Sequence, residues 1–132
     1  PIVIPHRDEY SETVGYVIAG SDKKALFIPD IDKWEKWTNR IEDWIAKVDY
    51  AFLDGTFFDA AEVNNRPMAE IPHPFISESI QRFQILPASE RTKIYFIHLN
   101  HTNPVLVKGH PLRLSMEAAG FHLAEFGAQF KL

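Results

Sequence analysis

The sequence contains no cysteine, and this absence limits the chemistry that is available to the chain. Without thiol groups, disulfide bonds and thiolate metal sites are both excluded. Any metal ion that the protein holds must therefore be bound by histidine, aspartate or glutamate.

A basic surface and a long apolar run are also lacking. The 14 Lys and Arg residues are outnumbered by 18 Asp and Glu residues, which gives a formal net charge of −4. Nucleic acids and anionic membranes are bound mainly through basic surfaces, so neither is expected as a partner. No apolar stretch approaches the roughly 20 residues that span a bilayer. We therefore expect a small-molecule substrate and no membrane contact.

The first residues contain neither an initiator Met nor a basic and apolar leader sequence. Because the chain begins directly with a strand-like segment, we expect that an upstream part has been removed and that the protein is cytoplasmic. A chain of 132 residues is one domain or part of one.

The hydrophobic pattern predicts strands and helices in alternation. Strands are expected at 1–5, 14–19, 24–28, 50–53, 94–97, 121–124 and 130–132. Helices are expected at 32–48, 57–63, 75–83 and 111–119. The helix at 32–48 has the clearest apolar stripe, and Asp32 and Glu35 have capping-box spacing at its start. This order of elements predicts one layered α/β unit.

Three predicted strands end in a side chain that can bind a metal. These residues are Asp30, Asp54 and His98, and His6 follows the first extended segment. Open α/β folds bind ligands at the carboxyl edge of the sheet, so we expect the four side chains to converge there. Imidazole and carboxylate ligands suit Zn²⁺, Mn²⁺ or Fe²⁺, and a carboxylate between two histidines can bridge two ions.

Each of these residues also has a structural interpretation that the sequence leaves open. Asp30 could be the N-cap of the following helix. Asp54 precedes Gly-Thr and could bind the amide groups of that turn or support the site from behind. His98 could be a hydrogen-bonded core residue, and His6 could lie on the surface. Taken singly, the other histidines are expected to be structural or exposed: His73, His101, His110 and His122.

Four short motifs surround the candidate ligands. They are Pro5-His6 followed by Thr13-Val14-Gly15-Tyr16, then Phe27-Ile28-Pro29-Asp30, then Asp-Tyr-Ala-Phe-Leu-Asp-Gly-Thr-Phe at 49–57, and Ile97-His98-Leu99-Asn100 with Thr102-Asn103-Pro104. Together they resemble the carboxyl-terminal half of the metallo-β-lactamase superfamily over nearly the whole chain. The nearest resemblance is to the pyrroloquinoline quinone biosynthesis protein B group, with the cyclic phosphodiesterases and ribonuclease Z enzymes further away.

The resemblance implies an α/β fold that is half of an αββα sandwich, with a mixed sheet and helices on one side. It also implies a two-metal site for Zn²⁺ or Mn²⁺, with His6 and His98 as terminal ligands and Asp30 as the bridge. Asp54 would be a structural carboxylate beside the site. His73 falls where the phosphodiesterase branches carry a histidine that contacts substrate and can act as an acid.

Several features depart from the family pattern. His101 stands where the quinone biosynthesis group has Asn, so we assign it to the loop. The ending also differs, because relatives place an Asp before Gly127, whereas this chain has Glu125-Phe126 there. The superfamily signature His-x-His-x-Asp-His, which belongs to the amino-terminal half of the fold, does not occur. We therefore expect residues 1–132 to be a carboxyl-terminal half that alone binds metal weakly or not at all.

The sequence supports three functional hypotheses. In the first, the intact protein is a metal-dependent hydrolase in which metal-bound hydroxide attacks a phosphodiester or related ester and His73 assists, while the fragment itself is inactive. In the second, the protein has a cofactor-pathway role like that of the quinone biosynthesis group. In the third, the chain is a non-catalytic half-domain that forms a homodimer through an uncovered sheet face.

Overall fold

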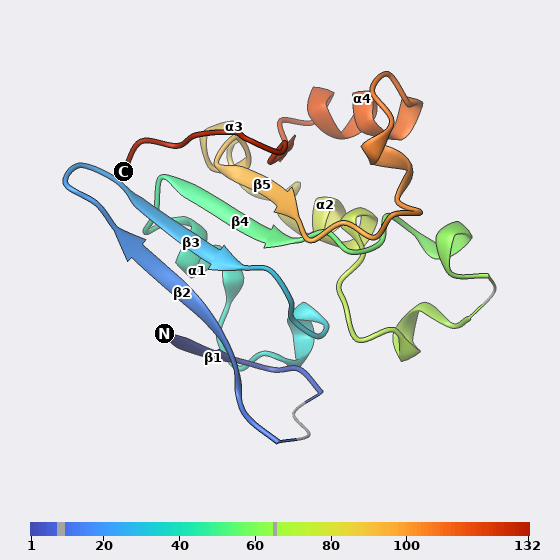
Figure 1. The fold of residues 1–132 in the computed structure, drawn as a ribbon, viewed down its shortest axis with the longest axis horizontal. Coiled ribbons are helices and arrows are strands. Elements are labelled where there is room, and N and C mark those ends of the chain that lie inside the picture. Colours follow the sequence, from blue (N-terminus) through green and yellow to red (C-terminus); the bar gives the residue numbers. More distant parts are fainter. Residues whose placement is uncertain (8–9, 65) are drawn as a thin grey trace.

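The computed structural model describes residues 1–7, 10–64 and 66–132, and it is built around a six-stranded sheet with the order β1-β2-β3-β4-β5-β6 (Figure 1). The strands are β1 (Ile2–Ile4), β2 (Thr13–Ala19), β3 (Lys24–Ile28), β4 (Tyr50–Asp54), β5 (Ile94–Ile97) and β6 (His122–Leu123). The pairs β1–β2 and β2–β3 are antiparallel, whereas β3, β4, β5 and β6 run parallel. The parallel strands therefore end at one common edge.

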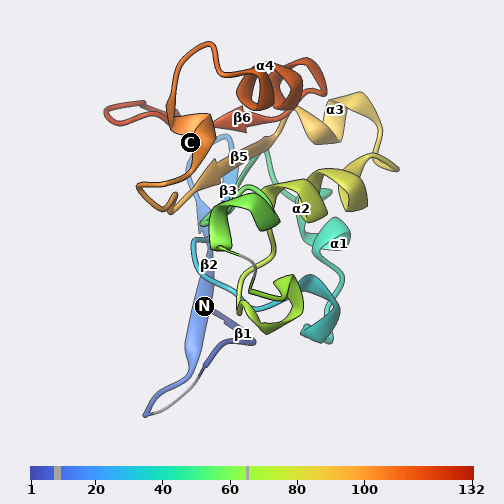
Figure 2. The ribbon, with the colours of Figure 1, turned by 90° about the vertical axis from the view of Figure 1, so that its right-hand side faces the viewer.

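The helices lie mainly on one side of this sheet. The α-helices are α1 (Ile41–Ile45), α2 (Ile76–Phe83), α3 (Ala88–Arg91) and α4 (Pro111–Ala118). Short 3-10 helices are η1 (Trp34–Lys36), η2 (Ala60–Val63), η3 (Met68–Glu70) and η4 (Pro104–Leu106). Figure 2 shows α1, α2 and α3 together on the same side of the sheet. The expected mixed sheet with helices on one side is confirmed.

The core lies between the sheet and these helices. Leu26 of β3, Leu53 of β4 and Phe96 of β5 are fully buried in it, together with Ile76 and Phe83 of α2. Burial of each such side chain contributes about 1.5–3 kcal/mol to the stability of the fold. This packing fixes the strands from which the candidate ligands extend.

The opposite face of the sheet is only partly covered. Ile18 and Phe27 are 46% and 36% exposed there. Phe130, near the end of the chain, packs its ring edge-on against Phe52 and Tyr95, with centroid distances of 4.8 and 4.9 Å. The strand expected at 130–132 is not formed, so this segment contributes side-chain contacts rather than a further strand.

The prediction of one long helix at 32–48 is wrong. The segment instead forms η1 and α1, with an extended break between them. Trp37 ends η1 in an extended conformation, with φ −85° and ψ 129°. The indole of Trp37 donates to the carbonyl of Val3 at 3.2 Å, whereas the indole of Trp34 donates to Ser79 Oγ at 2.9 Å. The two indoles therefore bind to different elements, α2 and β1. The expected capping box is also absent, since Asp32 instead accepts from the Lys33 backbone N–H and from Lys36.

Within the described residues, the helices are all too short or too polar to cross a lipid bilayer.

Candidate metal centre

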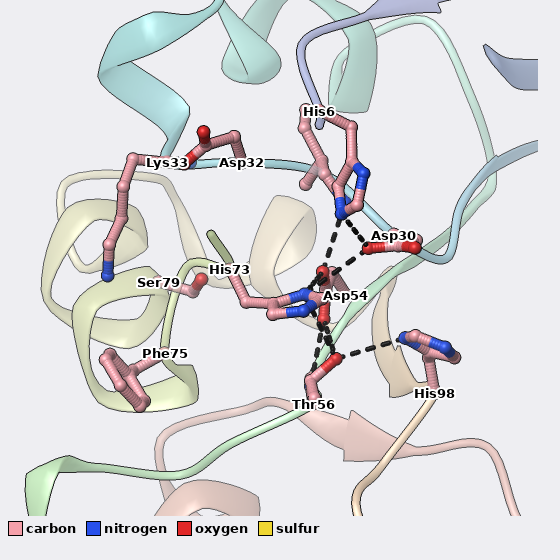
Figure 3. Close-up of polar contacts among 12 residues, drawn as sticks. His6, Asp30, Asp32, Lys33, Asp54, Thr56, His73, Phe75, Ser79 and His98 are labelled. Carbon is pink, nitrogen blue, oxygen red and sulfur yellow. Dashed lines mark hydrogen bonds and ion pairs between the residues drawn. The ribbon is translucent and has the colours of Figure 1, made fainter. Parts of the chain in front are cut away.

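The candidate ligands come together at the carboxyl edge of the parallel strands (Figure 3). Asp30 follows β3, Asp54 ends β4 and His98 follows β5, while His73 comes from the loop that precedes α2. One ligand atom of each of these four side chains lies within 4.8 Å of the others. The predicted convergence is therefore present, and His73 belongs to the same cluster.

His6 reaches the cluster through Asp30. His6 Nε2 lies 2.9 Å from Asp30 Oδ1, and both atoms are buried. Neither atom has a hydrogen-bond partner among the described residues, so the short distance is not that of a well-formed hydrogen bond. Buried polar atoms without a partner are rare, and a bound ion is one established reason for them.

Asp54 is fully buried, and its carboxylate is surrounded by donors. Oδ2 accepts from the Ile31 backbone N–H at 3.1 Å and lies 2.8 Å from His73 Nδ1. Oδ1 accepts from the Thr56 backbone N–H at 2.9 Å and from the Thr56 hydroxyl at 2.7 Å. A carboxylate has about four lone-pair positions that can accept, and these four contacts fill them. Asp54 is therefore placed to orient its neighbours rather than to bind an ion directly.

His73 is held between two carboxylates. Its Nδ1 lies 2.8 Å from Asp54 Oδ2 and 3.4 Å from Asp30 Oδ1. Burial lowers the pKa of His73, but the hydrogen bond to Asp54 and the surrounding carboxylate charges outweigh burial and raise the pKa above its usual value. The imidazole is therefore suited to hold a proton at the edge of the site.

His98 occupies an unusual backbone conformation where β5 ends. Its φ is +59°, in the left-handed region that residues other than glycine rarely adopt. The side chain is exposed, so the alternative of a core histidine is wrong. His98 Nδ1 lies 3.0 Å from the hydroxyl of Thr56, which is buried. Strained backbone of this kind clusters at functional sites.

The loop after His98 is held by hydrogen bonds to the β4 turn. Asn103 is buried and donates through its amide to the carbonyls of Gly55 and Thr56, at 2.9 and 3.2 Å. The Asn100 N–H donates to the carbonyl of Thr56 at 2.9 Å. The Thr-Asn-Pro motif thus connects the two turns that carry Asp54 and His98.

A second set of contacts fixes the Asp30 loop to α2. The ammonium group of Lys33, which is buried, lies 2.7 Å from Glu78 Oε2 and 4.5 Å from the centre of the Phe75 ring. Glu78 Oε2 also accepts from the Phe75 backbone N–H at 2.9 Å. Because Phe75 follows His73 by two residues, these contacts hold the His73 loop beside the Asp30 loop (Figure 3).

The structure decides several alternatives that the sequence left open. Asp30 is not a helix cap, because η1 begins after Lys33 and has no side-chain cap. The prediction that Asp54 binds the turn amides is confirmed by its contact with Thr56 N–H. His101 is exposed in the loop, as expected.

Two further histidines have structural positions away from the cluster. His110 caps α4 by accepting from the Leu112 N–H at 3.2 Å. His122 stacks on the ring of Tyr95, with a centroid distance of 4.9 Å. Thr56 was not anticipated as part of the site; the only sequence signal was a hydroxyl residue two positions after Asp54.

The donor set fits a divalent transition metal. His6 Nε2 and Asp30 Oδ1 are buried without hydrogen-bond partners, and His98 adds a second imidazole within the cluster. Nitrogen and carboxylate oxygen donors are those that Zn²⁺, Mn²⁺ and Fe²⁺ accept. The assignment of His6, Asp30 and His98 as ligands stays a prediction.

Comparison with known proteins gives a family and a fold. Residues 1–99 match the model of the beta-lactamase superfamily domain. The chain is 31% identical over 129 residues to coenzyme PQQ synthesis protein B of Methylobacterium radiotolerans, covering 94% of the chain and 42% of that protein. It is 29% identical over 126 residues to the protein of the same name from Gluconobacter oxydans, covering 92% of the chain and 40% of that protein.

A solved structure has the same fold. The crystal structure of Zn²⁺-bound PqqB from Methylobacterium extorquens matches with a TM-score of 0.75 and 24% identity, over 98% of the chain and 48% of that protein. The predicted half of the αββα fold is thereby confirmed. The chain spans about two fifths of the length of the curated relatives described above.

Proposed function

The chain belongs to the metallo-β-lactamase superfamily, and from this premise we propose that it forms part of the metal centre of a protein that acts in coenzyme PQQ synthesis. The similarity to coenzyme PQQ synthesis protein B extends over more than nine tenths of the chain. This support favours the cofactor-pathway hypothesis over that of a general hydrolase.

The observation that carries the proposal is the buried pair of His6 Nε2 and Asp30 Oδ1. These atoms lie 2.9 Å apart without a hydrogen bond, and Asp30 belongs to a cluster that also contains His98. The PqqB structure with the same fold is described as Zn²⁺-bound, which supports zinc as the ion for this donor set. When bound, such an ion polarises water or a substrate oxygen.

The other side chains of the cluster would orient the site and handle a proton. Asp54 accepts from His73 Nδ1 and fixes the direction of that ring. His73, with its raised pKa, would hold a proton beside Asp30 and deliver it from Nε2 to a substrate that lies over the site. Asp30 would bind the ion and, if two ions are present, bridge them.

We further propose that residues beyond this chain complete the centre. Two imidazoles and one carboxylate make three protein ligands, which is fewer than a closed site or a pair of ions requires. The chain covers 40 to 42% of the relatives described above, which supports residues 1–132 as the carboxyl-terminal half of a longer domain. The same missing part would cover the apolar sheet face around Ile18 and Phe27.

Genetic complementation tests the cofactor-pathway role. A bacterium that has lost its coenzyme PQQ synthesis protein B is supplied with the intact protein that contains this chain, and PQQ in the culture is measured by mass spectrometry. We expect PQQ to return with the wild-type protein and with Asp43→Asn, a matched change of an exposed carboxylate on α1. We expect Asp30→Asn to fail although the variant is expressed. Absence of PQQ with a folded, zinc-loaded wild-type protein would contradict the proposal.

The position of His73 supports ester hydrolysis as a second candidate function. The His73 imidazole lies next to Asp30 and has a raised pKa, so it is placed to give a proton to a leaving oxygen. The test is an assay of the intact, zinc-loaded protein on a chromogenic phosphodiester, with His73→Gln as the comparison. Hydrolysis that His73→Gln reduces while zinc content stays constant would support this function, and absence of hydrolysis in both proteins would exclude it.

A further inference from the structure

We propose that Thr56 is a positioning residue that sets which ring nitrogen of His98 carries the proton and so leaves Nε2 free as the metal-binding atom. The inference rests on the proposed role of His98 as a ligand. Thr56 itself would not touch the ion; its hydroxyl lies between the Asp54 carboxylate and the His98 ring (Figure 3).

The proton positions follow from the contacts of the Thr56 hydroxyl. This group has one proton to donate and lone pairs with which to accept. Thr56 Oγ1 lies 2.7 Å from Asp54 Oδ1, and the carboxylate can only accept. The single hydroxyl proton therefore lies on the line to Asp54, since two oxygens at this distance without a proton between them would repel each other.

His98 must then be the donor in its contact with Thr56. His98 Nδ1 lies 3.0 Å from Thr56 Oγ1, whose proton is already given to Asp54. A ring nitrogen without a proton would place its lone pair against the lone pairs of the hydroxyl. The contact is favourable only with the proton on Nδ1, and in the neutral ring this leaves Nε2 with its lone pair.

His73 does not compete strongly for the same hydroxyl. Its Nδ1 lies 3.3 Å from Thr56 Oγ1 but only 2.8 Å from Asp54 Oδ2. The shorter contact takes the Nδ1 proton of His73. One buried carboxylate thus fixes His73 directly and His98 through Thr56, which is how residues behind a metal site commonly hold its histidines.

The backbone around Thr56 is held independently of its hydroxyl. The Gly55 N–H donates to the carbonyl of Ile97 at 2.9 Å, and the carbonyl of Thr56 accepts from Asn100 N–H and from the Asn103 amide. A change of Thr56 to Val therefore removes the hydroxyl while these backbone contacts remain. Thr102 offers a matched control, because its hydroxyl lies on the loop that follows His98 but contacts Asn100 and Glu62 instead of a candidate ligand.

The ring protonation can be read directly by two-bond ¹H–¹⁵N correlation spectra of the ¹⁵N-labelled, metal-free intact protein at a pH where the rings are neutral. His110 provides an internal reference of the opposite kind, because its Nδ1 accepts from Leu112 N–H and its proton must lie on Nε2. We expect His98 to be protonated on Nδ1 in the wild-type chain and in Thr56→Ser and Thr102→Val. In Thr56→Val we expect the proton to move to Nε2, the form that an unconstrained histidine favours.

Zinc affinity of the intact protein that contains this chain gives the second measurement, by competition with a chromogenic chelator. We expect Thr56→Val to weaken zinc binding by about 10- to 100-fold, and Thr56→Ser to restore it. A wild-type His98 protonated on Nε2, or an unchanged His98 in Thr56→Val, would overturn the inference without touching the metal assignment. Failure of the intact wild-type protein to bind zinc, with the expected ring states present, would instead count against the proposed function.

Discussion

His6 Nε2 and Asp30 Oδ1 lie 2.9 Å apart in the interior, yet neither has a hydrogen-bond partner among the described residues. The distance is that of an ion pair, and Asp30 Oδ1 also lies 3.4 Å from His73 Nδ1. Buried polar atoms without a well-formed hydrogen bond form an arrangement that a bound ion can complete. The contact is compatible with the proposed role of both side chains as metal ligands.

Replacement of Asp30 should separate metal binding from stability. We expect Asp30→Asn to lower zinc affinity by at least about tenfold, because the anionic ligand is lost. Its free energy of unfolding, measured with urea in the presence of a chelator, should fall by less than about 1 kcal/mol, because the substitution removes only the charge of Asp30 beside His6 and His73. Asp43→Asn should leave both quantities unchanged. A metal-free Asp30→Asn chain that is much less stable than the wild type would assign Asp30 a structural role.

The left-handed backbone conformation of His98 should lower the free energy of unfolding when the residue at this position has a Cβ atom. At φ +59° a residue with a Cβ atom is disfavoured by about 1–2 kcal/mol relative to glycine. We therefore expect His98→Gly to be more stable than His98→Ala by about 1 kcal/mol in urea unfolding. Both variants lose the imidazole, so the difference isolates the backbone.

The same pair of substitutions at Gln81 provides the control for His98. Gln81 is exposed on α2, where glycine is less stable than alanine by about 1 kcal/mol. The order of the two variants should therefore be reversed. If His98→Gly and His98→Ala unfold alike, the strained conformation is wrong.

The pair of Glu42 and Arg82 should make the stability depend on acidic pH. Arg82 Nε and a second guanidinium nitrogen lie 2.6 and 3.1 Å from the two Glu42 oxygens. Burial raises the pKa of Glu42, but the hydrogen bonds and charge of Arg82 outweigh it, and the pKa falls below its usual value. The pair therefore stabilises the fold above the unfolded-state pKa of about 4.3, and this contribution is lost as pH falls through the lower, folded-state pKa.

Glu42→Gln should remove that contribution. We expect a loss of about 1–2 kcal/mol at pH 7 and a weaker decline of stability as the pH is lowered through the acidic range. Unfolding in urea at a series of pH values measures both. Glu35→Gln, a change of an exposed residue in η1, is the control and should keep the wild-type profile. An unchanged pH dependence in Glu42→Gln would show that the ion pair does not form.

The open sheet face should drive self-association of the isolated chain. Tyr16, Ile18 and Phe27 are 45%, 46% and 36% exposed on this face. Apolar surface that is not covered by a partner favours association. In sedimentation velocity runs we expect the average mass to rise with concentration, and Ile18→Lys to reduce this effect. Ile85→Lys, at an equally apolar but separate exposed position, should not. A monomer at all concentrations would count against self-pairing.

Much of the site could be predicted from the sequence, because each strand is a run of apolar residues and its end is visible as the first polar residue after that run. Asp54 and His98 each follow a continuous apolar run, and the parallel register of β4 and β5 brings Asp54 opposite Ile97. Asp30 follows the neighbouring strand in the same way. Parallel strands end at one common edge of a sheet. The position of each of these residues directly after a predicted strand is therefore enough to predict that they lie close together.

The remaining features depend on tertiary contacts that have no local signal. The contact between Thr56 and His98 joins residues 42 positions apart and exists only because β4 and β5 pair. The break after η1 arises because Trp34 and Trp37 bind to Ser79 and Val3, which belong to distant parts of the chain. An apolar stripe is equally compatible with a continuous helix, so periodicity could not reveal the break.

The central claim is that one cation is shared by His6, Asp30 and His98. Anomalous diffraction at the zinc absorption edge, from crystals of the intact protein that contains this chain, soaked in excess zinc, tests it most directly. We predict an anomalous peak within bonding distance of His6 Nε2, Asp30 Oδ1 and a ring nitrogen of His98. Zinc bound only at other positions, with these three side chains left without an ion, would contradict the account.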